Sequence, residues 1–311
     1  MKVAIVGAGI AGLSCATRLR EGGHLVSLFD KGRGPGGRMA TRRVDTPAGE
    51  VAFDHGAQYV TARHPDFVAA MSAWASAGVV ARWPAAGADA WVGTPGMNAI
   101  VKHLAANATV FWNHRVDRIL RADAGWRLDD GGAGVFDAVV VATPAEQAAP
   151  LLAPHDPIMA SEALSCRSTP CWTAMLAFAE PVGACQDVIR AAPPIAWAAR
   201  NNAKPGRDGT EAWVVQADAD WSIAHLESDP DQVTTALTAA VAEQVGTALP
   251  PLVARSAHRW RFARARAIDL GCLWNDDDRI GAAGDWLVAP RVESAWLSGR
   301  WLAERILADQ N

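Results

Sequence analysis

VAIVGAGIAG, at residues 3–12, is a short apolar run that leads directly into a Gly-x-Gly-x-x-Gly motif. Glycines in this spacing, between a strand and a helix, are typical of a turn that holds the pyrophosphate of a dinucleotide. Gly7 permits the sharp turn, Gly9 lets backbone amides approach phosphate, and Gly12 lets the helix pack closely on the strand. The stretch therefore predicts a dinucleotide site, with the N–H groups and the positive end of the helix facing the anion.

A second strand is predicted at residues 25–29, and it ends at an acidic residue, Asp30. An acid at this distance after the glycines is expected to bind a ribose with a free 2′-hydroxyl, which favours NAD or FAD over NADP. The run KGRGPGGRMAT at residues 31–41 is rich in Gly and Arg and predicts a second anion-binding turn. Arg38 can fork onto a pyrophosphate oxygen, which favours FAD, although a flexible basic surface loop is the alternative.

Five segments carry a resemblance to a known family: GGR at 36–38, DHGAQY at 54–59, WVGTPGM at 91–97, GDW at 284–286 and RVESAWLSG at 291–299. Together they resemble the renalase-like family of the flavin amine-oxidase superfamily, from the N-terminus to the last helix. This resemblance implies an α/β fold, with an FAD/NAD(P)-binding Rossmann-like domain and a discontinuous, strand-rich α+β substrate domain.

The order of predicted elements divides the chain between these two domains. A buried β-branched run at residues 139–144 returns to the nucleotide-binding sheet, and the strand-rich middle of the chain is inserted in sequence. Another long strand is predicted from Val110 to Leu120. We expect residues 1–60, 92–150 and 271–311 to form the FAD-binding domain, and residues 61–91 and 151–270 the substrate domain.

The resemblance and the motifs together indicate the residues that bind the cofactor, which we expect to be held non-covalently. Asp285 is expected to accept a hydrogen bond from a ribityl hydroxyl, and the helix after it to direct its positive end at the flavin. His55 could contact or even link the flavin, although a structural histidine is favoured. The expected cofactor-binding residues are Gly7, Gly9, Ile10, Ala11, Gly12, Asp30, Lys31, Gly37, Arg38, Met39, Ala57, Gln58, Met97, Val116, Gly284, Asp285, Glu293 and Ala295.

Candidates for the substrate site lie in the middle of the chain and near its end. His258, Trp260 and Phe262 alternate, which places them on one face of a strand. Such a face could cover an aromatic ligand or pack in the core. Position on the resembled pattern indicates six residues that position or enclose the substrate: Gln58, Tyr59, Asn201, His258, Trp260 and Trp286.

The resemblance implies an FAD-dependent oxidase that oxidises 2- or 6-dihydronicotinamide dinucleotides to NAD(P)+. Hydride would pass to flavin N5, and O2 would be reduced to H2O2. Because the product is an aromatic pyridinium, such a site needs positioning more than a general base, and the sequence offers no evident base. The alternatives are a flavin amine oxidase acting on a small amine, and a non-catalytic protein that binds FAD or NAD as a regulator.

Composition limits the other possibilities. The chain has 311 residues, half of them apolar, and a net charge of −4, which suits a large core and argues against nucleic acid as a partner. No apolar run is long enough to span a membrane, and no metal-ligand spacing is present. Five cysteines without a Cys-x-x-Cys motif fit a reducing cytoplasm. We therefore expect a cytoplasmic protein whose partners are a small dinucleotide substrate and O2.

Overall fold

The computed structural model of the chain describes residues 1–47, 49–129, 132–183 and 186–309, so Cys185 lies outside the described residues. The chain divides into two compact units. The first unit contains residues 1–37, 101–168 and 265–311, and the second unit contains residues 38–100 and 169–264. These boundaries differ from the predicted domains, because residues 38–60 and 92–100 belong to the second unit and residues 151–168 and 265–270 to the first.

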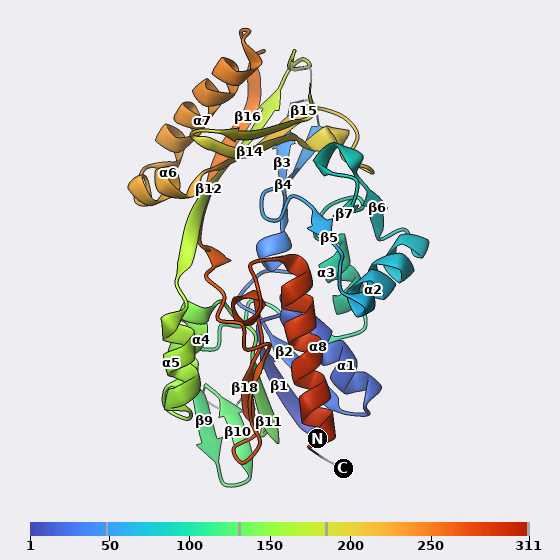
Figure 1. Cartoon of the computed structure of the whole chain (residues 1–311), viewed down its shortest axis with the longest axis vertical. Coiled ribbons are helices and arrows are strands. Elements are labelled where there is room, and N and C mark those ends of the chain that lie inside the picture. Colours follow the sequence, from blue (N-terminus) through green and yellow to red (C-terminus); the bar gives the residue numbers. More distant parts are fainter. Residues whose placement is uncertain (48, 130–131, 184–185, 310–311) are drawn as a thin grey trace. The chain divides into compact units, whose positions relative to one another are not determined.

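The first unit is built on a six-stranded sheet with the order β17-β18-β11-β1-β2-β8 (Figure 1). The strands β1, β2, β8, β11 and β18 pair in parallel, and β17 pairs with β18 in the antiparallel sense. The predicted buried parallel strand is confirmed as β11, whose four residues are all buried. The bounds are β1 Lys2–Val6, β2 Leu25–Phe29, β8 Thr109–Phe111, β11 Ala138–Val141, β17 Leu273–Asn275 and β18 Ile280–Ala282.

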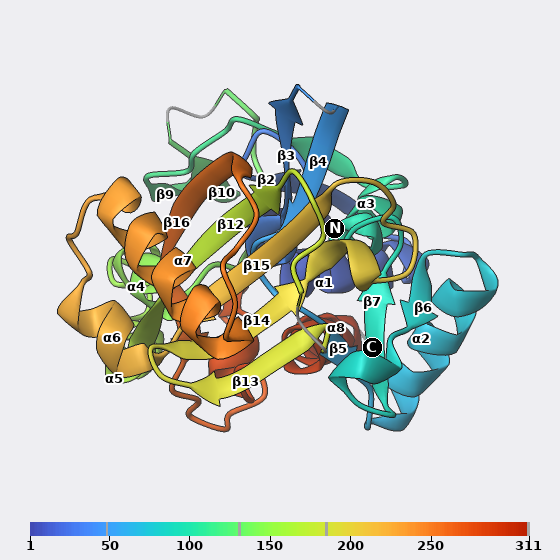
Figure 2. The same cartoon turned by 90° about the horizontal axis from the view of Figure 1, so that it is seen from above.

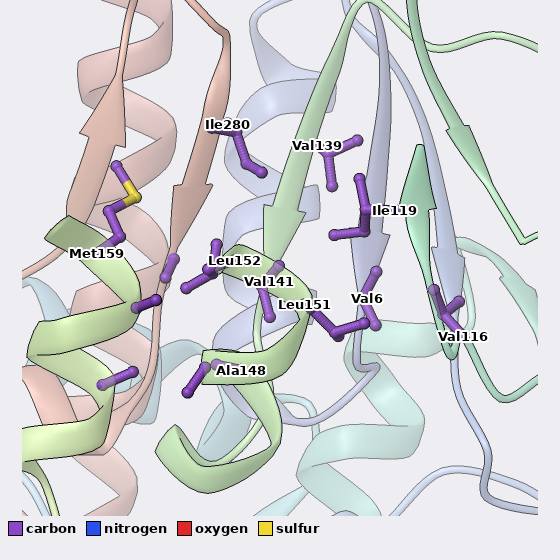
Figure 3. Packing of buried hydrophobic residues seen from close by; sticks show 14 of the residues in the cluster. Val6, Val116, Ile119, Val139, Val141, Ala148, Leu151, Leu152, Met159 and Ile280 are labelled. Atoms are coloured by element: carbon purple, nitrogen blue, oxygen red, sulfur yellow. The ribbon is translucent and has the colours of Figure 1, made fainter. Parts of the chain in front are cut away.

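Helices and a hairpin complete the first unit, and the α/β fold class is as predicted. Leu151 and Leu152 of α4 and Met159 of α5 pack on Val141 of β11 and Ile280 of β18 in one hydrophobic core (Figure 3). The bounds are α1 Ile10–Glu21, α4 Ala145–Leu152, α5 Pro157–Ser165, η4 Asp285–Leu287, α8 Val292–Ala308, and the hairpin β9 Ile119–Ala122 with β10 Gly125–Leu128.

The prediction of one long strand from Val110 to Leu120 was wrong. The strand β8 ends at Phe111, and Asn113 then adopts a left-handed conformation with φ 57°. The backbone N–H of Asn113 donates to the carbonyl of Gly32 at 2.9 Å, so the chain leaves the sheet to cover the turn after β2. The apolar run alone could not show this change of direction.

The second unit is rich in strands, as Figure 2 shows for the sheet β13-β14-β15-β12-β16 and the helix α7. Val233 and Leu237 of α7 are buried in the same core as Trp213 and Val215 of β15. The bounds of the main sheet are β12 Ser168–Phe178, β13 Val188–Ala192, β14 Ile195–Arg200, β15 Glu211–Ala217 and β16 Leu252–Ala265.

The other elements of the second unit are a hairpin, a small three-stranded sheet and several helices. The hairpin β3-β4 and the small sheet β5-β7-β6 flank the loop that follows β4 in the sequence. Within the described residues, no helix is both long and apolar enough to cross a membrane. The bounds are β3 Thr41–Thr46, β4 Gly49–Asp54, β5 Val60–Thr61, α2 Pro65–Ser76, β6 Val80–Arg82, β7 Ala90–Gly93, η3 Asn201–Ala203, α6 Ala219–Ala224 and α7 Pro230–Val245, while α3 Ala99–Ala105 crosses the boundary between the units.

The helices α1 and α8 approach each other very closely at Gly299. A Cβ at this position would lie 2.0 Å from the carbonyl oxygen of Ala11 and 3.1 Å from the amide nitrogen of Cys15. Since both neighbours are backbone atoms of α1, neither can move away without distorting that helix. Gly299 therefore fixes α8 against the helix that begins the dinucleotide-binding motif.

We predict that Gly299→Ala lowers the free energy of unfolding by about 2–3 kcal/mol, because the new methyl group forces the two helices apart. Urea denaturation measures this loss. The matched control is Gly183→Ala, where the added Cβ would be 3.8 Å from its nearest neighbour and should change stability little. Equal stability of the two variants would contradict the close approach of α1 and α8.

Candidate functional site

The turn between β1 and α1 has the geometry of a phosphate-binding loop. Gly7 has φ +105°, and a Cβ there would lie 2.6 Å from the carbonyl oxygen of Ala142. A Cβ on Gly12 would lie 2.0 Å from the carbonyl oxygen of Gly7. Gly9 is the N-cap of α1 and differs from these two, because a Cβ on it would have no neighbour within 4 Å. The open space beside Gly9 and the uncapped N–H groups of α1 fit a phosphate.

Asp30 ties the two glycine-rich turns together. Its carboxylate accepts hydrogen bonds from the N–H of Ala8 and the N–H of Gly32, both at 2.7 Å. Gly37 closes the second turn with φ +52°, and a Cβ there would lie 3.8 Å from the Cα of Gly9. Because a carboxylate has about four lone-pair sites, Asp30 retains capacity for the ribose hydroxyls that the sequence predicts it to bind.

The remaining predicted adenine-side residues differ in their exposure. Lys31 is exposed, and its Nζ donates to Oε1 of Gln147 at 3.1 Å. Ile10 and Ala11 are buried in the first turn of α1. Val116 lies in the hydrophobic core of the first unit (Figure 3). These positions leave Val116 only a small exposed surface with which to meet an adenine.

The C-terminal segment of the first unit holds Gly284, Asp285, Glu293 and Ala295, and all four are buried. The N–H of Gly284 donates to Oγ of Ser298 at 3.0 Å, which links η4 to α8.

Trp286 corrects a sequence-based prediction. It was expected to enclose the substrate, but its side chain is completely buried in the first unit's core. Its Nε1 donates to the carbonyl of Thr143 at 3.2 Å. A ring with no exposed surface has no face to offer a ligand, so Trp286 supports the cofactor-binding segment from behind.

The second unit contains a buried ion-pair cluster at the end of β4. Both oxygens of Asp54 are occupied. Lys204 Nζ lies 3.3 Å and Arg207 Nη2 2.6 Å from Oδ2, and Oδ1 accepts from Thr41 Oγ1 at 2.7 Å and the N–H of Met97 at 2.9 Å. The side chains of Asp54 and Lys204 are completely buried. We call Asp54, Lys204 and Arg207 the Asp54 cluster.

Burial and charge determine the protonation of the Asp54 cluster. Burial alone would raise the pKa of Asp54, but Lys204 and Arg207 together hold this pKa below its usual value. Burial lowers the pKa of Lys204 to about 8, although the charge of Asp54 opposes that effect. At neutral pH one carboxylate therefore faces two cations, and the cluster carries an excess positive charge.

The loop of residues 55–59, here called the 55–59 loop, is held by the same cluster. Gln58 Nε2 donates to the carbonyls of Asp54 and Gly56, and Oε1 accepts from Lys204 Nζ at 3.1 Å. The N–H of Ala57 donates to the carbonyl of Arg38 at 2.8 Å. Both amide hydrogens of Gln58 are used inside the protein, so this side chain holds the loop. Gln58 was predicted to bind the cofactor and to position or enclose the substrate, and holding this loop is a positioning role.

Asn201 and Met97 are also part of this internal structure. Asn201 Nδ2 donates to the carbonyl of Ala52 at 2.8 Å, and its Oδ1 accepts from the N–H of Asp54 at 3.4 Å. Asn201 is 1% exposed and Met97 is fully buried. Met39 is buried as well. Asn201 was predicted to position or enclose the substrate and Met97 to bind the cofactor; both are buried here and hydrogen-bond to the end of β4.

Two residues of the predicted ring face, His258 and Trp260, lie together on β16 in the second unit. The rings of His258 and Trp260 lie 4.4 Å apart, and Trp260 Nε1 donates to the carbonyl of His55 at 2.8 Å. Burial, together with the charge of Arg42, lowers the pKa of His258 to about 4. Burial, then His258 and Arg42, lower the pKa of His55 to about 4 as well. Both imidazoles are therefore neutral at pH 7.

A second group of rings extends from the other end of the 55–59 loop. Tyr59 lies 5.2 Å from the ring of Trp197, which meets Trp83 at 6.4 Å. Arg190 stacks over Trp197 at 4.7 Å. Trp197 is buried, and its Nε1 has no hydrogen-bond partner among the described residues. The predicted residues Tyr59, His258 and Trp260 thus belong to two ring groups joined by one loop.

Two models of known protein families match the chain. A model of NAD(P)-binding Rossmann-like domains matches residues 5–74, and a model of flavin-containing amine oxidoreductases matches residues 82–307. The chain belongs to the flavin-containing amine oxidoreductase family. Its cofactor is FAD, as predicted, and it is an FAD-dependent oxidoreductase of the amine oxidase superfamily. The open cradle at Gly9 fits the pyrophosphate of that cofactor.

Solved structures share the fold at low sequence identity. This flavin-dependent oxidoreductase is similar to a putative protoporphyrinogen oxidase from Exiguobacterium sp. 255-15, with a TM-score of 0.76 and 13% identity over 99% of both chains. It is also similar to putrescine oxidase bound to putrescine, with a TM-score of 0.73 and 15% identity over 99% of both chains. Cyclohexylamine oxidase from Brevibacterium oxydans IH-35A gives a TM-score of 0.72 and 12% identity, again over 99% of both chains.

Among curated proteins, the similarity is confined to a short segment. The chain is 44% identical over 45 residues to 4,4'-diapophytoene desaturase (4,4'-diaponeurosporene-forming) of Staphylococcus aureus (strain Newman). That segment is 14% of this chain and spans only 9% of the length of the desaturase.

Sequence reasoning missed the Asp54 cluster and the rings of Trp83 and Trp197. Asp54 lies in the segment DHGAQY, and Lys204 and Arg207 lie in a distant basic stretch of the sequence. No spacing rule joins residues 150 positions apart, so only the fold shows that they form one ion pair.

We predict that Gly9→Ala and Gly12→Ala fail in different ways. Gly9→Ala has room within the protein, so the apoprotein should keep its Tm and lose FAD, because the methyl group occupies the phosphate's space. Gly12→Ala should lower the Tm of the apoprotein itself, because its Cβ meets the backbone of Gly7. Thermal melts with and without FAD distinguish the two outcomes. Full FAD binding by Gly9→Ala would contradict the assigned pyrophosphate site.

We predict that Asp54→Asn lowers the free energy of unfolding by about 3–5 kcal/mol, because it leaves two buried cations without a counter-ion. Chemical denaturation provides the measurement. Asp45→Asn, at an exposed position of the same hairpin, is the control and should change stability by less than about 1 kcal/mol. If both variants are equally stable, the charge assignment of the cluster is incorrect.

Proposed function

We propose that this protein is an FAD-dependent oxidase of isomeric dihydronicotinamide dinucleotides. Its substrates carry the extra hydride at the 2 or 6 position of the nicotinamide ring. The dihydropyridine loses a hydride and becomes the aromatic pyridinium of NAD(P)+. O2 takes up the two electrons, and with that hydrogen and one proton from water it becomes H2O2. When bound, FAD supplies the N5 atom that accepts the hydride and returns the electrons to O2.

The excess positive charge beside the 55–59 loop is the observation that carries this proposal. Asp54 is already paired with Lys204 and Arg207, and Arg42 adds a further cation close to the two imidazoles. A dinucleotide brings a negatively charged pyrophosphate, whereas a protonated amine brings a positive charge. The local charge beside the 55–59 loop therefore favours the dinucleotide over the amine.

The ring groups and the neutral histidines give a second line of support. Tyr59 and Trp260 are each partly exposed and stand in groups of rings that suit a flat aromatic ligand. His55 and His258 have pKa values of about 4, so they do not charge the site at neutral pH. Loss of hydride from a dihydropyridine needs no general base. This requirement agrees with a site whose polar side chains are hydrogen-bonded to the backbone and are not placed to remove a proton from a substrate.

Oxidation of a small amine is the second candidate function. The family to which the chain belongs favours it, as do the fold neighbours named for putrescine and cyclohexylamine. The two functions differ in what reduces the bound flavin.

We predict that, in the absence of O2, 2- and 6-dihydronicotinamide dinucleotides bleach the visible flavin spectrum within seconds. Ordinary 4-dihydro NADH, putrescine and cyclohexylamine should leave the spectrum unchanged at the same concentrations. Readmitting O2 should restore the oxidised spectrum with one H2O2 formed per turnover.

Other outcomes of this experiment overturn the proposal in distinct ways. Bleaching by amines alone would identify an amine oxidase, and bleaching by ordinary NADH would identify a reductase. No bleaching by any of these compounds would contradict the proposal and would place the substrate outside both classes of compound.

A further inference from the structure

We infer that Lys204 is a positioning residue, which sets the conformation of the 55–59 loop and of the aromatic rings beside it. The inference rests on the proposed function at one point, which is that the 55–59 loop lies beside the substrate. Lys204 is completely buried and contacts Asp54, Gln58 and the ring of Trp83, so one ammonium group joins the stretch 54–58 to a second segment of the second unit.

Charge balance does not require Lys204. Arg207 alone would neutralise Asp54, since its Nε and Nη2 lie 2.8 and 2.6 Å from Oδ2. The second cation therefore adds a surplus charge in a fully buried place, where it costs stability. Because the charge of Lys204 is not needed to neutralise Asp54, we infer that the contacts of Lys204 specify the conformation of the 55–59 loop.

The first such contact fixes the side-chain amide of Gln58. An ammonium group only donates hydrogen bonds, so the atom 3.1 Å from Lys204 Nζ must be the oxygen of Gln58. The amide nitrogen then faces the carbonyls of Asp54 and Gly56 and donates to both. With the amide reversed, NH2 would face the ammonium and the oxygen would face two carbonyls. Lys204 thereby selects one orientation of the Gln58 amide. In that orientation the amide nitrogen bonds the carbonyls of Asp54 and Gly56 and holds the 55–59 loop together.

The second contact reaches the other end of the same loop. Lys204 Nζ lies 5.3 Å from the centre of the Trp83 ring, which meets Trp197 edge-on. Trp197 in turn contacts Tyr59, which follows Gln58 directly in the chain. Lys204 thus acts on Tyr59 both through the neighbouring Gln58 and through the two indoles. Removing its charge should loosen the loop from both sides.

Lys204→Met tests this inference, with the exposed Lys102→Met as the matched control. Hydrogen exchange is followed by mass spectrometry on the FAD-loaded proteins without substrate. Peptides covering residues 54–60 should exchange roughly tenfold faster or more in Lys204→Met, since an amide oxygen loses a charged donor. Peptides from β14 and β15 should exchange at the rate of the control. Unchanged exchange at 54–60, or an equal rise throughout the second unit, would overturn the inference.

Gln58→Leu approaches the same contact from the other side and serves if Lys204→Met does not fold. By itself Gln58→Leu should accelerate exchange at residues 54–60. Where Lys204→Met does fold, adding it to Gln58→Leu should cause less further acceleration than adding it to the wild type. Fully additive effects would contradict the coupling. A loosened loop in a protein that oxidises no dihydronicotinamide would refute only the proposed function. A rigid loop in an active Lys204→Met enzyme would refute only the role of Lys204.

Discussion

The pairing of the buried Asp54 carboxylate with Lys204 and Arg207 is the interaction on which the second unit's candidate site depends. This pairing joins the end of β4 to the segment after β14. The Asp54 carboxylate also accepts a hydrogen bond from the N–H of Met97. The polar side chains nearest the 55–59 loop are therefore used to hold backbone in place. Beside this loop stand the partly exposed rings of Tyr59 and Trp260 and the neutral imidazoles of His55 and His258.

In the first unit, close packing around glycines shapes the turn between β1 and α1. Gly7 and Gly12 are enclosed by backbone and keep the strand, turn and helix close together, whereas Gly9 borders open space. Asp30 then fastens the second glycine-rich turn to the first through two backbone N–H groups. A site assembled this way is ready for an anionic dinucleotide, because the helix N–H groups already point at the space beside Gly9.

The sequence predicted the local elements well and the long-range contacts poorly. Glycine spacing and the apolar run before Pro144 identified β1, α1 and β11, because each signal is local. The turn at Asn113 was missed, since its cause is a hydrogen bond to Gly32. Trp286 shows the same limit: an indole in a resembled motif gives no sign of which face is buried. The ion pair between residues 54 and 204 left no pattern at all.

The account ascribes substrate choice to charge and to aromatic positioning on the FAD scaffold of the family. It therefore predicts discrimination between isomers that share every atom and differ only in the ring carbon that carries the hydride. The most direct measurement is proton NMR of a mixture of 2-, 4- and 6-dihydronicotinamide dinucleotides incubated with enzyme in air. The account predicts that the 2- or 6-isomer signals disappear, NAD(P)+ signals grow to match, and the 4-isomer persists. Loss of the 4-isomer, or no change in a mixture while an added amine is consumed, would contradict it.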